Sequence, residues 1–443
     1  MLTMTNRHSR TGGRVPGIAA GIGALLLASL LPSGTAHAAE AESLVDGWAV
    51  TTKKAADGIT YTRYTEPSTA ANPRVVDVLV ADPAAGALSL QSTFGVDTAT
   101  AEKTTSQLDS VTTSATRKPY AGTNAGFFDT DQSTLVFKGI AAKDGVLQGA
   151  ACLRSRPGAP AAVIQYGVPY VTELSTALSV TSSATGATRE LDDINRDPGR
   201  VPGCAKGSDD EKFEISEDTY AWKDASEIVS FTPQYGALTP RPGGAAHVTE
   251  DNDPGVEVVL SSAGRVTAVY EGRGGRTVPS GGRILQGIGE GADWLRANAP
   301  AGAVLTLDEE VRDEHFDEEL VLDASVDIVN GTYLLVRDAA YAYTGSNIKS
   351  DPRTSIGADG YGRTMLVTVT GTKGRAGATL DELAKLMLHL GAVDALNLDG
   401  GGSTAMVVGA TLVTPSQEKD GTERPVGDAV YVGHGGYGLY ATS

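Results

Sequence analysis

The stretch that decides the fold runs Ala395-Leu-Asn-Leu-Asp-Gly-Gly-Gly-Ser-Thr-Ala-Met-Val-Val408. An apolar strand ends at Asn397 and Asp399, three glycines and two hydroxyl residues follow, and a second apolar strand begins. Adjacent glycines let a backbone approach a ligand closely and direct several N–H groups at one oxyanion. A tight loop between two buried strands would also explain the glycines. The Asn and the Asp at the mouth of the first strand favour a functional site instead.

Strands predominate on both sides of this stretch. Apolar and alternating runs predict strands at residues 75–80, 87–92, 364–370 and 392–398. Two helices are predicted, at 104–115 and 380–390, and Thr379 with Glu382 forms a capping box for the second. We therefore expect the α+β class, with strand-rich mixed sheets and a few packed helices in a single elaborate catalytic domain.

The N-terminus has the pattern of a secretory signal. Arg7, Arg10 and Arg14 precede an apolar run from Ile18 to Leu31, and Ala36-His-Ala38 is a small-x-small cleavage site. The apolar run is too short for a stable transmembrane helix. We therefore expect no membrane span, and a secreted or extracellular chain that is cleaved near Ala38.

The charge of the chain argues against a nucleic-acid partner. The formal net charge of the 443 residues is −18, and loss of the three signal-peptide arginines takes it to −21. Nucleic-acid binding requires a positive surface. An anionic substrate would therefore need a local positive site within an acidic surface.

The only two cysteines, Cys152 and Cys204, predict a disulfide, because exported proteins fold in an oxidising compartment. Residues 184–212, which include Cys204, are rich in Gly, Pro and Asp, which is typical of a long surface excursion. We expect the disulfide to pin this excursion to the rest of the fold.

Three segments together resemble the phosphodiester glycosidase family. They are Asn124-Ala-Gly-Phe-Phe128, Asp351-Pro-Arg-Thr-Ser-Ile-Gly357 and Ala395-Leu-Asn-Leu-Asp-Gly-Gly-Gly-Ser-Thr404. Residues 331–337 and 421–427 agree further, and the resemblance extends from about residue 75 to 440. With the signal pattern, we expect three parts of the chain: the signal peptide at 1–38, N-terminal strands leading into the catalytic domain at 39–118, and the phosphodiester glycosidase domain at 119–441.

The resemblance implies an exported hydrolase that splits the C1–O bond of a sugar-1-phosphodiester in cell-envelope or extracellular glycan. The leaving phosphate ester is already anionic, so it needs electrostatic stabilisation more than protonation. We expect Arg353 to contact the phosphate, together with the backbone amides of Gly400, Gly401 and Gly402. A carboxylate must activate water or attack the anomeric carbon, and Asp399 is the first candidate and Asp129 the second.

The motifs supply six further candidates for substrate binding: Asn124, Gly126, Thr354, Asn397, Ser403 and Arg424. The two asparagines suit hydrogen bonds to sugar hydroxyls or to phosphate. Arg424 follows a Gly-Thr-Glu turn and either reaches the same cleft or forms a surface ion pair. The role of Asp399 stays open between nucleophile, base and metal ligand, because its oxygens can also hold a divalent metal.

Two other functions fit the same residues. A non-catalytic phosphoglycan-binding module would use the glycine-rich turn to bind without turnover. An ordinary glycosidase acting on neutral sugar linkages would place two carboxylates across a cleft with no arginine near them. Convergence of Asn124, Arg353 and Asp399 in one pocket would distinguish a phosphodiester glycosidase from both of these alternatives.

Overall fold

The structure is a computed structural model, and it describes residues 43–85, 88–112, 118–130, 134–152, 158–207, 209–216, 219–245, 248–372 and 375–434. All of these residues belong to one compact unit. The predicted signal peptide at residues 1–38 lies outside the described residues. Within the described part of the chain, no helix is long and apolar enough to cross a membrane.

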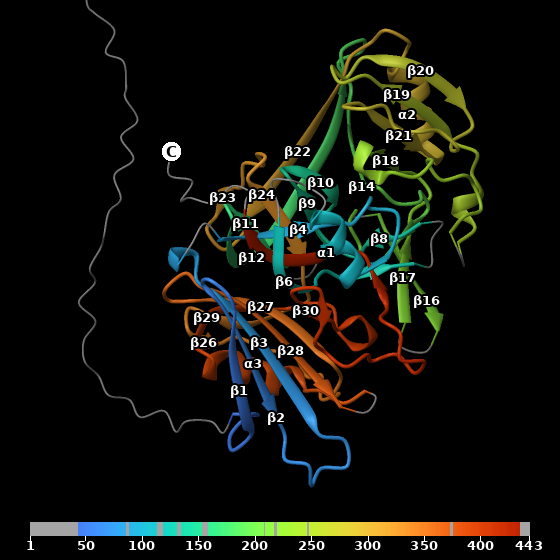
Figure 1. The fold of residues 1–443 in the computed structure, drawn as a ribbon. Helices are drawn as coiled ribbons and strands as arrows, with labels where there is room; N and C mark the ends of the chain where they lie inside the picture. The colour runs from blue at the N-terminus through green and yellow to red at the C-terminus, as the bar shows by residue number, and fades with distance from the viewer. Residues whose placement is uncertain are drawn as a thin grey trace, which may run out of the picture. The chain divides into compact units, whose positions relative to one another are not determined.

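The first eight-stranded sheet joins the N-terminal strands to the C-terminal third of the chain. Figure 1 shows the blue strands β1, β2 and β3 beside the orange strands β28 and β27. All of its neighbouring strands are antiparallel. In spatial order the strands are β1 (Ala49–Ala56), β2 (Ile59–Thr65), β3 (Arg74–Ala81), β28 (Thr364–Gly371), β27 (Arg353–Asp359), β29 (Ala392–Asn397), β25 (Tyr333–Arg337) and β26 (Ala340–Tyr341).

Helix α3 (Leu380–His389) covers one face of this sheet. The predicted capping box is confirmed, since the Thr379 side chain accepts a hydrogen bond from the Glu382 amide. Side chains alternate between the two faces of a strand. Along β3, Val76 and Val78 accordingly pack with α3, whereas Leu79 joins a second core on the opposite face.

That opposite face packs against a five-stranded antiparallel sheet. Leu79 and Leu366 of the first sheet share one buried cluster with Leu90, Met406 and Val430 of the second. The second sheet carries the ends of two motifs, because β6 ends at Asn124 and β30 follows the glycine-rich turn. Its strands, in spatial order, are β31 (Thr411–Leu412), β30 (Met406–Val408), β6 (Lys118–Asn124), β33 (Ala429–His434) and β4 (Leu88–Thr93).

The central part of the chain forms a third, eight-stranded antiparallel sheet. Its buried residues Ala162 and Val329 join the same buried cluster. Its long strands β12 and β22 pair over nine residues. The sheet comprises β10 (Val146–Gly149), β9 (Ala141–Lys143), β24 (Val326–Asn330), β11 (Ala159–Gln165), β12 (Val168–Ser182), β22 (Leu305–Asp313), β23 (Glu318–Glu319) and β13 (Thr188–Glu190), which pairs with β12.

The remaining elements form smaller groups. A five-stranded sheet contains β14 (Asp193–Ile194), β18 (Ile228–Phe231), β21 (Arg283–Gly287), β19 (Val256–Leu260) and β20 (Val266–Glu271). A three-stranded sheet contains β15 (Arg200–Val201), β17 (Thr219–Lys223) and β16 (Glu211–Ser216). There are also two isolated strand pairs: β5 (Glu102–Lys103) with β32 (Pro425–Val426), and β7 (Phe128–Asp129) with β8 (Val136–Phe137). The other two α-helices of the described residues are α1 (Thr104–Thr112) and α2 (Gly289–Asn298).

The predicted α+β class is therefore confirmed: strands predominate, and a few helices pack against them. The strand predictions agree with β3, β4, β28 and β29 to within a few residues. Helix α1 matches the predicted helix up to Thr112, and the last three predicted residues, 113–115, lie outside the described residues.

The predicted surface excursion at residues 184–212 is wrong in its main part. Arg196 and Arg200 are among the largest fully buried side chains of the described residues. Arg196 forms ion pairs with Asp193 at 2.9 Å and with Glu227, and both partners are buried. Polar composition usually indicates a surface, but charged side chains can be buried when each has a partner. The segment between β13 and β16 is thus largely interior.

The predicted disulfide is confirmed. Cys152, just after β10, is bonded to Cys204, and their Cα atoms are 5.6 Å apart. The bond therefore ties the buried segment after β15 to the end of β10.

Replacing both cysteines by serine should lower the free energy of unfolding by about 4 kcal/mol, because the bond closes a loop with a sequence separation of 52 in the unfolded chain. Urea denaturation of the parent protein and of Cys152→Ser/Cys204→Ser measures the difference. Parent protein held in reductant should unfold like the double variant. Equal midpoints in oxidised parent and variant would contradict a structural role for the bond.

Candidate active site

Asn124, at the end of β6, joins all three of the family-like segments. Its side-chain oxygen accepts hydrogen bonds from the Thr354 hydroxyl at 2.8 Å and from the Ala405 amide at 3.1 Å. Its side-chain nitrogen donates to the Asp399 carbonyl at 2.8 Å. The side chain is buried, and its bonds all go to the protein. Asn124 therefore positions the turn that carries Asp399.

Ala125 and Gly126, the two residues after Asn124, form hydrogen bonds with both Asp399 and Asp428. The Asp399 amide donates to the Ala125 carbonyl at 2.9 Å, and the Ala125 amide donates to the Asp428 carbonyl at 3.2 Å. The Gly126 amide donates to Asp428 Oδ1 at 2.7 Å. Asp399 and Asp428 are thus brought to one short segment from two different parts of the chain.

Asp428 was not among the residues predicted from the sequence. It lies directly after Gly427, the last residue of the 421–427 segment that resembles the family, and just before β33. Its side chain is buried, and Oδ2 has no hydrogen-bond partner among the described residues. A Cβ atom on Gly126 would lie 2.7 Å from Asn330 Nδ2 and 3.2 Å from that oxygen, so glycine lets both side chains approach this segment.

Burial raises the pKa of Asp399 to about 6, against a usual value near 4. Hydrogen bonds from the Ser403 hydroxyl and from the Gly400 amide, at 2.9 Å, oppose the rise. The positive charges of Lys138 and Arg424 also oppose it. Asp399 is half-buried, so its carboxylate keeps some access to solvent.

Burial likewise raises the pKa of Asp428, to about 7. The negative charge of Asp399 raises it further, and the hydrogen bond from the Gly126 amide lowers it. Both carboxyl groups therefore titrate closer to neutral pH than an ordinary aspartate, and Asp428 keeps its proton to the higher pH. Two carboxyl groups whose environments separate their pKa values are the usual arrangement for an acid and a base in one site.

The three glycines bring backbones together and orient Asp399. Gly400 donates to Asp399 Oδ1, and Gly401 donates to the Pro352 carbonyl at 2.8 Å. A Cβ atom on Gly400 would lie 2.6 Å from that carbonyl oxygen, and Gly401 has φ +61°. Two of the three amides expected to bind an oxyanion thus already have acceptors within the protein.

Arg424 lies against the third glycine. A Cβ atom on Gly402 would lie 2.0 Å from Glu418 Oε1 and 2.4 Å from Arg424 Cζ, so glycine leaves room for both side chains beside the turn. Arg424 forms an ion pair with Glu418, and its side chain is 38% exposed. With Lys138 it provides the positive charge beside Asp399.

The guanidinium of Arg353 lies away from Asp399 and the glycine-rich turn. Nε donates to the Ala378 carbonyl at 2.9 Å and Nη2 to the Lys349 carbonyl at 2.8 Å, on the face of the sheet that α3 covers. Its neighbour Thr354 points to the other face and contacts Asn124. The backbone of Arg353 adjoins Gly400, but the side chain expected to bind phosphate leads away from the turn.

Asp129 and Asn397 also have partners outside this group. Asp129 forms an ion pair with Arg200 at 3.3 Å. Asn397 donates to the Thr332 hydroxyl at 2.8 Å, and its side-chain oxygen is buried without a hydrogen-bond partner among the described residues. Of the predicted residues, the structure therefore gathers Asn124, Gly126, Thr354, Asp399, Gly400, Gly401, Gly402, Ser403 and Arg424.

Comparison with known proteins gives the same family as the motifs. The phosphodiester glycosidase family model matches residues 254–433, which include Asp399, Arg424 and Asp428. Residues 254–433 are therefore similar to the phosphodiester glycosidase family. Asn124 and Gly126 precede the matched region and reach the site through β6.

The chain is also similar to two curated proteins, the N-acetylglucosamine-1-phosphodiester alpha-N-acetylglucosaminidases of Bos taurus and Homo sapiens. The Bos taurus protein is 32% identical over 121 residues, and the Homo sapiens protein is 32% identical over 120 residues. Each match covers 23% of this chain and 23% of the relative, so it spans about a quarter of either protein.

Two solved structures share the fold. A protein of Burkholderia pseudomallei, described as exported, has a TM-score of 0.72 at 21% identity, covering 87% of this chain and 96% of its own. A hypothetical protein from Synechocystis has a TM-score of 0.63 at 20% identity, covering 88% of this chain and 64% of its own. At this level of identity the likeness concerns the fold alone.

The raised pKa of Asp428 predicts a pH-dependent gain in stability for Asp428→Asn. Between pH 4 and pH 7 the folded protein holds a proton that the unfolded chain releases, so the parent loses stability as pH rises. Asparagine keeps the acceptor for Gly126 and cannot ionise. The variant should gain roughly 2–4 kcal/mol in unfolding free energy at pH 8, and less than about 1 kcal/mol at pH 4.5.

Urea denaturation at the two pH values measures this gain. Asp293→Asn is the matched control, because this carboxylate is exposed and its removal should change stability equally at both pH values. An Asp428→Asn effect that is the same at pH 4.5 and pH 8 would show that Asp428 titrates normally.

Proposed function

We propose that this chain is an exported phosphodiester glycosidase that hydrolyses the C1–O bond of a sugar-1-phosphodiester in cell-envelope or extracellular glycan. The observation that carries the proposal is the carboxyl pair Asp399 and Asp428, held on either side of residues 124–126 with Arg424 beside it. Similarity of residues 254–433 to the family suggests the reaction class. The disulfide and the predicted signal peptide support export.

Asp399 is assigned the step at the anomeric carbon. It is the more acidic carboxyl of the pair and is ionised near neutral pH. It acts on the carbon directly as nucleophile or through a water molecule as base, and both routes need an ionised carboxylate. The Gly400 amide and the Ser403 hydroxyl hold it in one orientation.

We assign binding of the substrate phosphate to Arg424 and Lys138. The leaving phosphate ester carries its charge before the bond breaks, and cations near the breaking bond stabilise the charge that develops on the leaving oxygen. Arg424 replaces Arg353 in this role, because the Arg353 guanidinium bonds to main-chain carbonyls on the other face of the sheet. Lys138 was not predicted from the sequence.

Hydrolysis of a neutral sugar linkage is the second candidate. The protonated carboxyl of Asp428 favours it, since an alkoxide leaving group is basic and needs a proton donor whereas a phosphate ester needs little. A binding module without turnover has less support, because it has no need for two carboxyl groups with separated pKa values.

Asp399→Asn should lower the rate of sugar release by at least about 10²-fold while the chain stays folded, because the side chain keeps its shape and loses its charge. The measurement is release of free sugar from a panel of sugar-1-phosphodiesters. Asp129→Asn is the matched control for the second predicted carboxylate. It breaks an ion pair with the buried Arg200 and should cost stability while it retains turnover. Near-normal turnover in Asp399→Asn would move the chemistry to another carboxylate.

Arg424→Gln should reduce cleavage of a sugar-1-phosphodiester about tenfold more than cleavage of the aryl glycoside of the same sugar, because only the first substrate carries phosphate. Arg375→Gln is the matched control, since Arg375 lies 3.9 Å from the same Glu418 and is half-exposed. Equal losses on both substrates would favour the neutral-sugar reaction and remove Arg424 as the phosphate ligand.

A further inference from the structure

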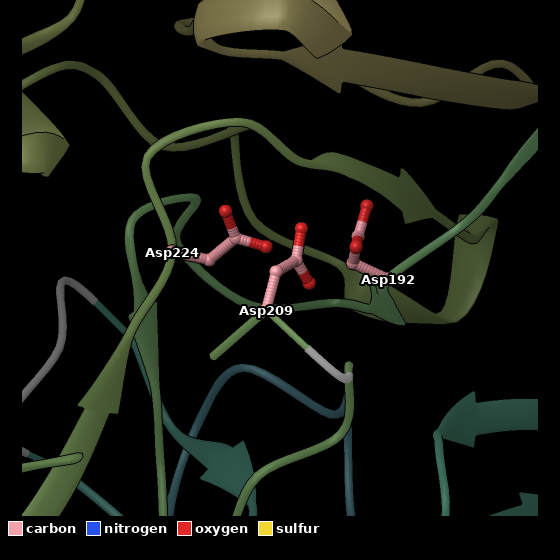
Figure 2. A group of neighbouring side chains, drawn as sticks. All are labelled: Asp192, Asp209 and Asp224. Atoms are coloured by element: carbon pink, nitrogen blue, oxygen red, sulfur yellow. The ribbon is translucent and has the colours of Figure 1, made fainter. Parts of the chain in front are cut away.

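A second group of carboxylates lies between β13 and β18. Asp192 precedes β14, Asp209 lies between β15 and β16, and Asp224 follows β17. One oxygen of each lies within 4.8 Å of the other two. Figure 2 shows the three side chains entering one space from three separate stretches of the chain. None of them takes part in the candidate active site.

The burial of Asp224 distinguishes this group from an ordinary cluster of acidic residues on a surface. The residue is 4% exposed. Its Oδ1 accepts a hydrogen bond from the Ser226 amide at 2.7 Å, whereas its Oδ2 is buried with no hydrogen-bond partner among the described residues. Figure 2 shows its carboxyl group directed toward Asp209. A buried carboxylate oxygen without a protein partner is costly, so this oxygen is available to bind a cation.

The basic side chains nearby pair with other acids. Arg196 binds Asp193 and Glu227, and Lys206 binds Asp193 at 2.8 Å. The ion pairs among the described residues include none with Asp192, Asp209 or Asp224. Three carboxylates therefore converge with no protein cation between them.

We propose that Asp192, Asp209 and Asp224 bind one calcium ion. A donor set made only of carboxylate oxygens selects a hard cation and disfavours zinc or copper. Oxygens that all lie within 4.8 Å of one another can bind one ion at about 2.4 Å, and calcium tolerates irregular geometry of this kind, whereas magnesium needs a near-ideal octahedron. Asp209 is exposed, so water can complete the coordination shell.

The ion would join three stretches that are otherwise linked by short strands. Asp192 lies on the β14 side, Asp209 follows the disulfide-bonded Cys204, and Asp224 follows β17. The Asp224 amide also donates to the Gly199 carbonyl at 3.3 Å, directly before Arg200. Calcium would therefore stabilise the segment whose Arg200 pairs with Asp129, independently of the reaction at Asp399.

Calorimetric titration of the chelator-treated, secreted full chain with CaCl₂ tests the proposal. The parent should bind one calcium per chain at up to millimolar concentration, and calcium should raise its Tm. Asp209→Asn and Asp224→Asn should each weaken binding at least about tenfold and remove the Tm increase. Asp209→Asn is the more secure variant, because its side chain is exposed and its replacement leaves no buried group unpaired.

Asp57→Asn controls for general attraction of calcium to an acidic protein, since this carboxylate is 81% exposed in the β1–β2 turn. It should bind calcium like the parent. Parent protein that binds no calcium, or Asp209→Asn that binds it as tightly as Asp57→Asn does, would overturn the proposal. Tighter binding of MgCl₂ than of CaCl₂ would overturn the assignment to calcium.

Discussion

The side-chain amide of Asn124 is the interaction on which the candidate site depends. It is buried, so its oxygen and nitrogen must be satisfied within the protein. The partners that satisfy it come from β27, from the Asp399 carbonyl and from the residue before β30. One side chain thereby fixes the glycine-rich turn against two sheets. The neighbouring Ala125 and Gly126 then set the positions of Asp399 and Asp428.

This arrangement keeps two carboxyl groups close together in a poorly solvated place. Both have raised pKa values, which means that the fold is less stable near neutral pH than it would be with neutral groups at the same positions. The positive charges of Arg424 and Lys138 reduce this cost for Asp399 alone. The result is a pair of carboxyl groups that both titrate near neutral pH, which a purely structural turn would not require.

The sequence predicted much of this and missed particular parts for physical reasons. Local patterns revealed the strands, the capped helix α3, the disulfide and the three segments that meet at Asn124. Arg353 and Thr354 are neighbours on one strand and point to opposite faces, so assigning both to the site ignored the two-residue period. Asp428 lies one residue past a recognised segment, and its role depends on a long-range contact with Gly126. The buried charges at Arg196 and Arg200 depend on partners that composition cannot show.

The central claim is that Asp399 and Asp428 hold one proton between them near neutral pH. Carbon-13 NMR of aspartate side chains, with assignment by Asp399→Asn and Asp428→Asn, measures this without knowledge of the substrate. We predict carboxyl resonances that titrate near pH 6 and near pH 7, with the higher midpoint falling in Asp399→Asn because a neighbouring negative charge is lost. Titration of both groups near pH 4 would contradict the account.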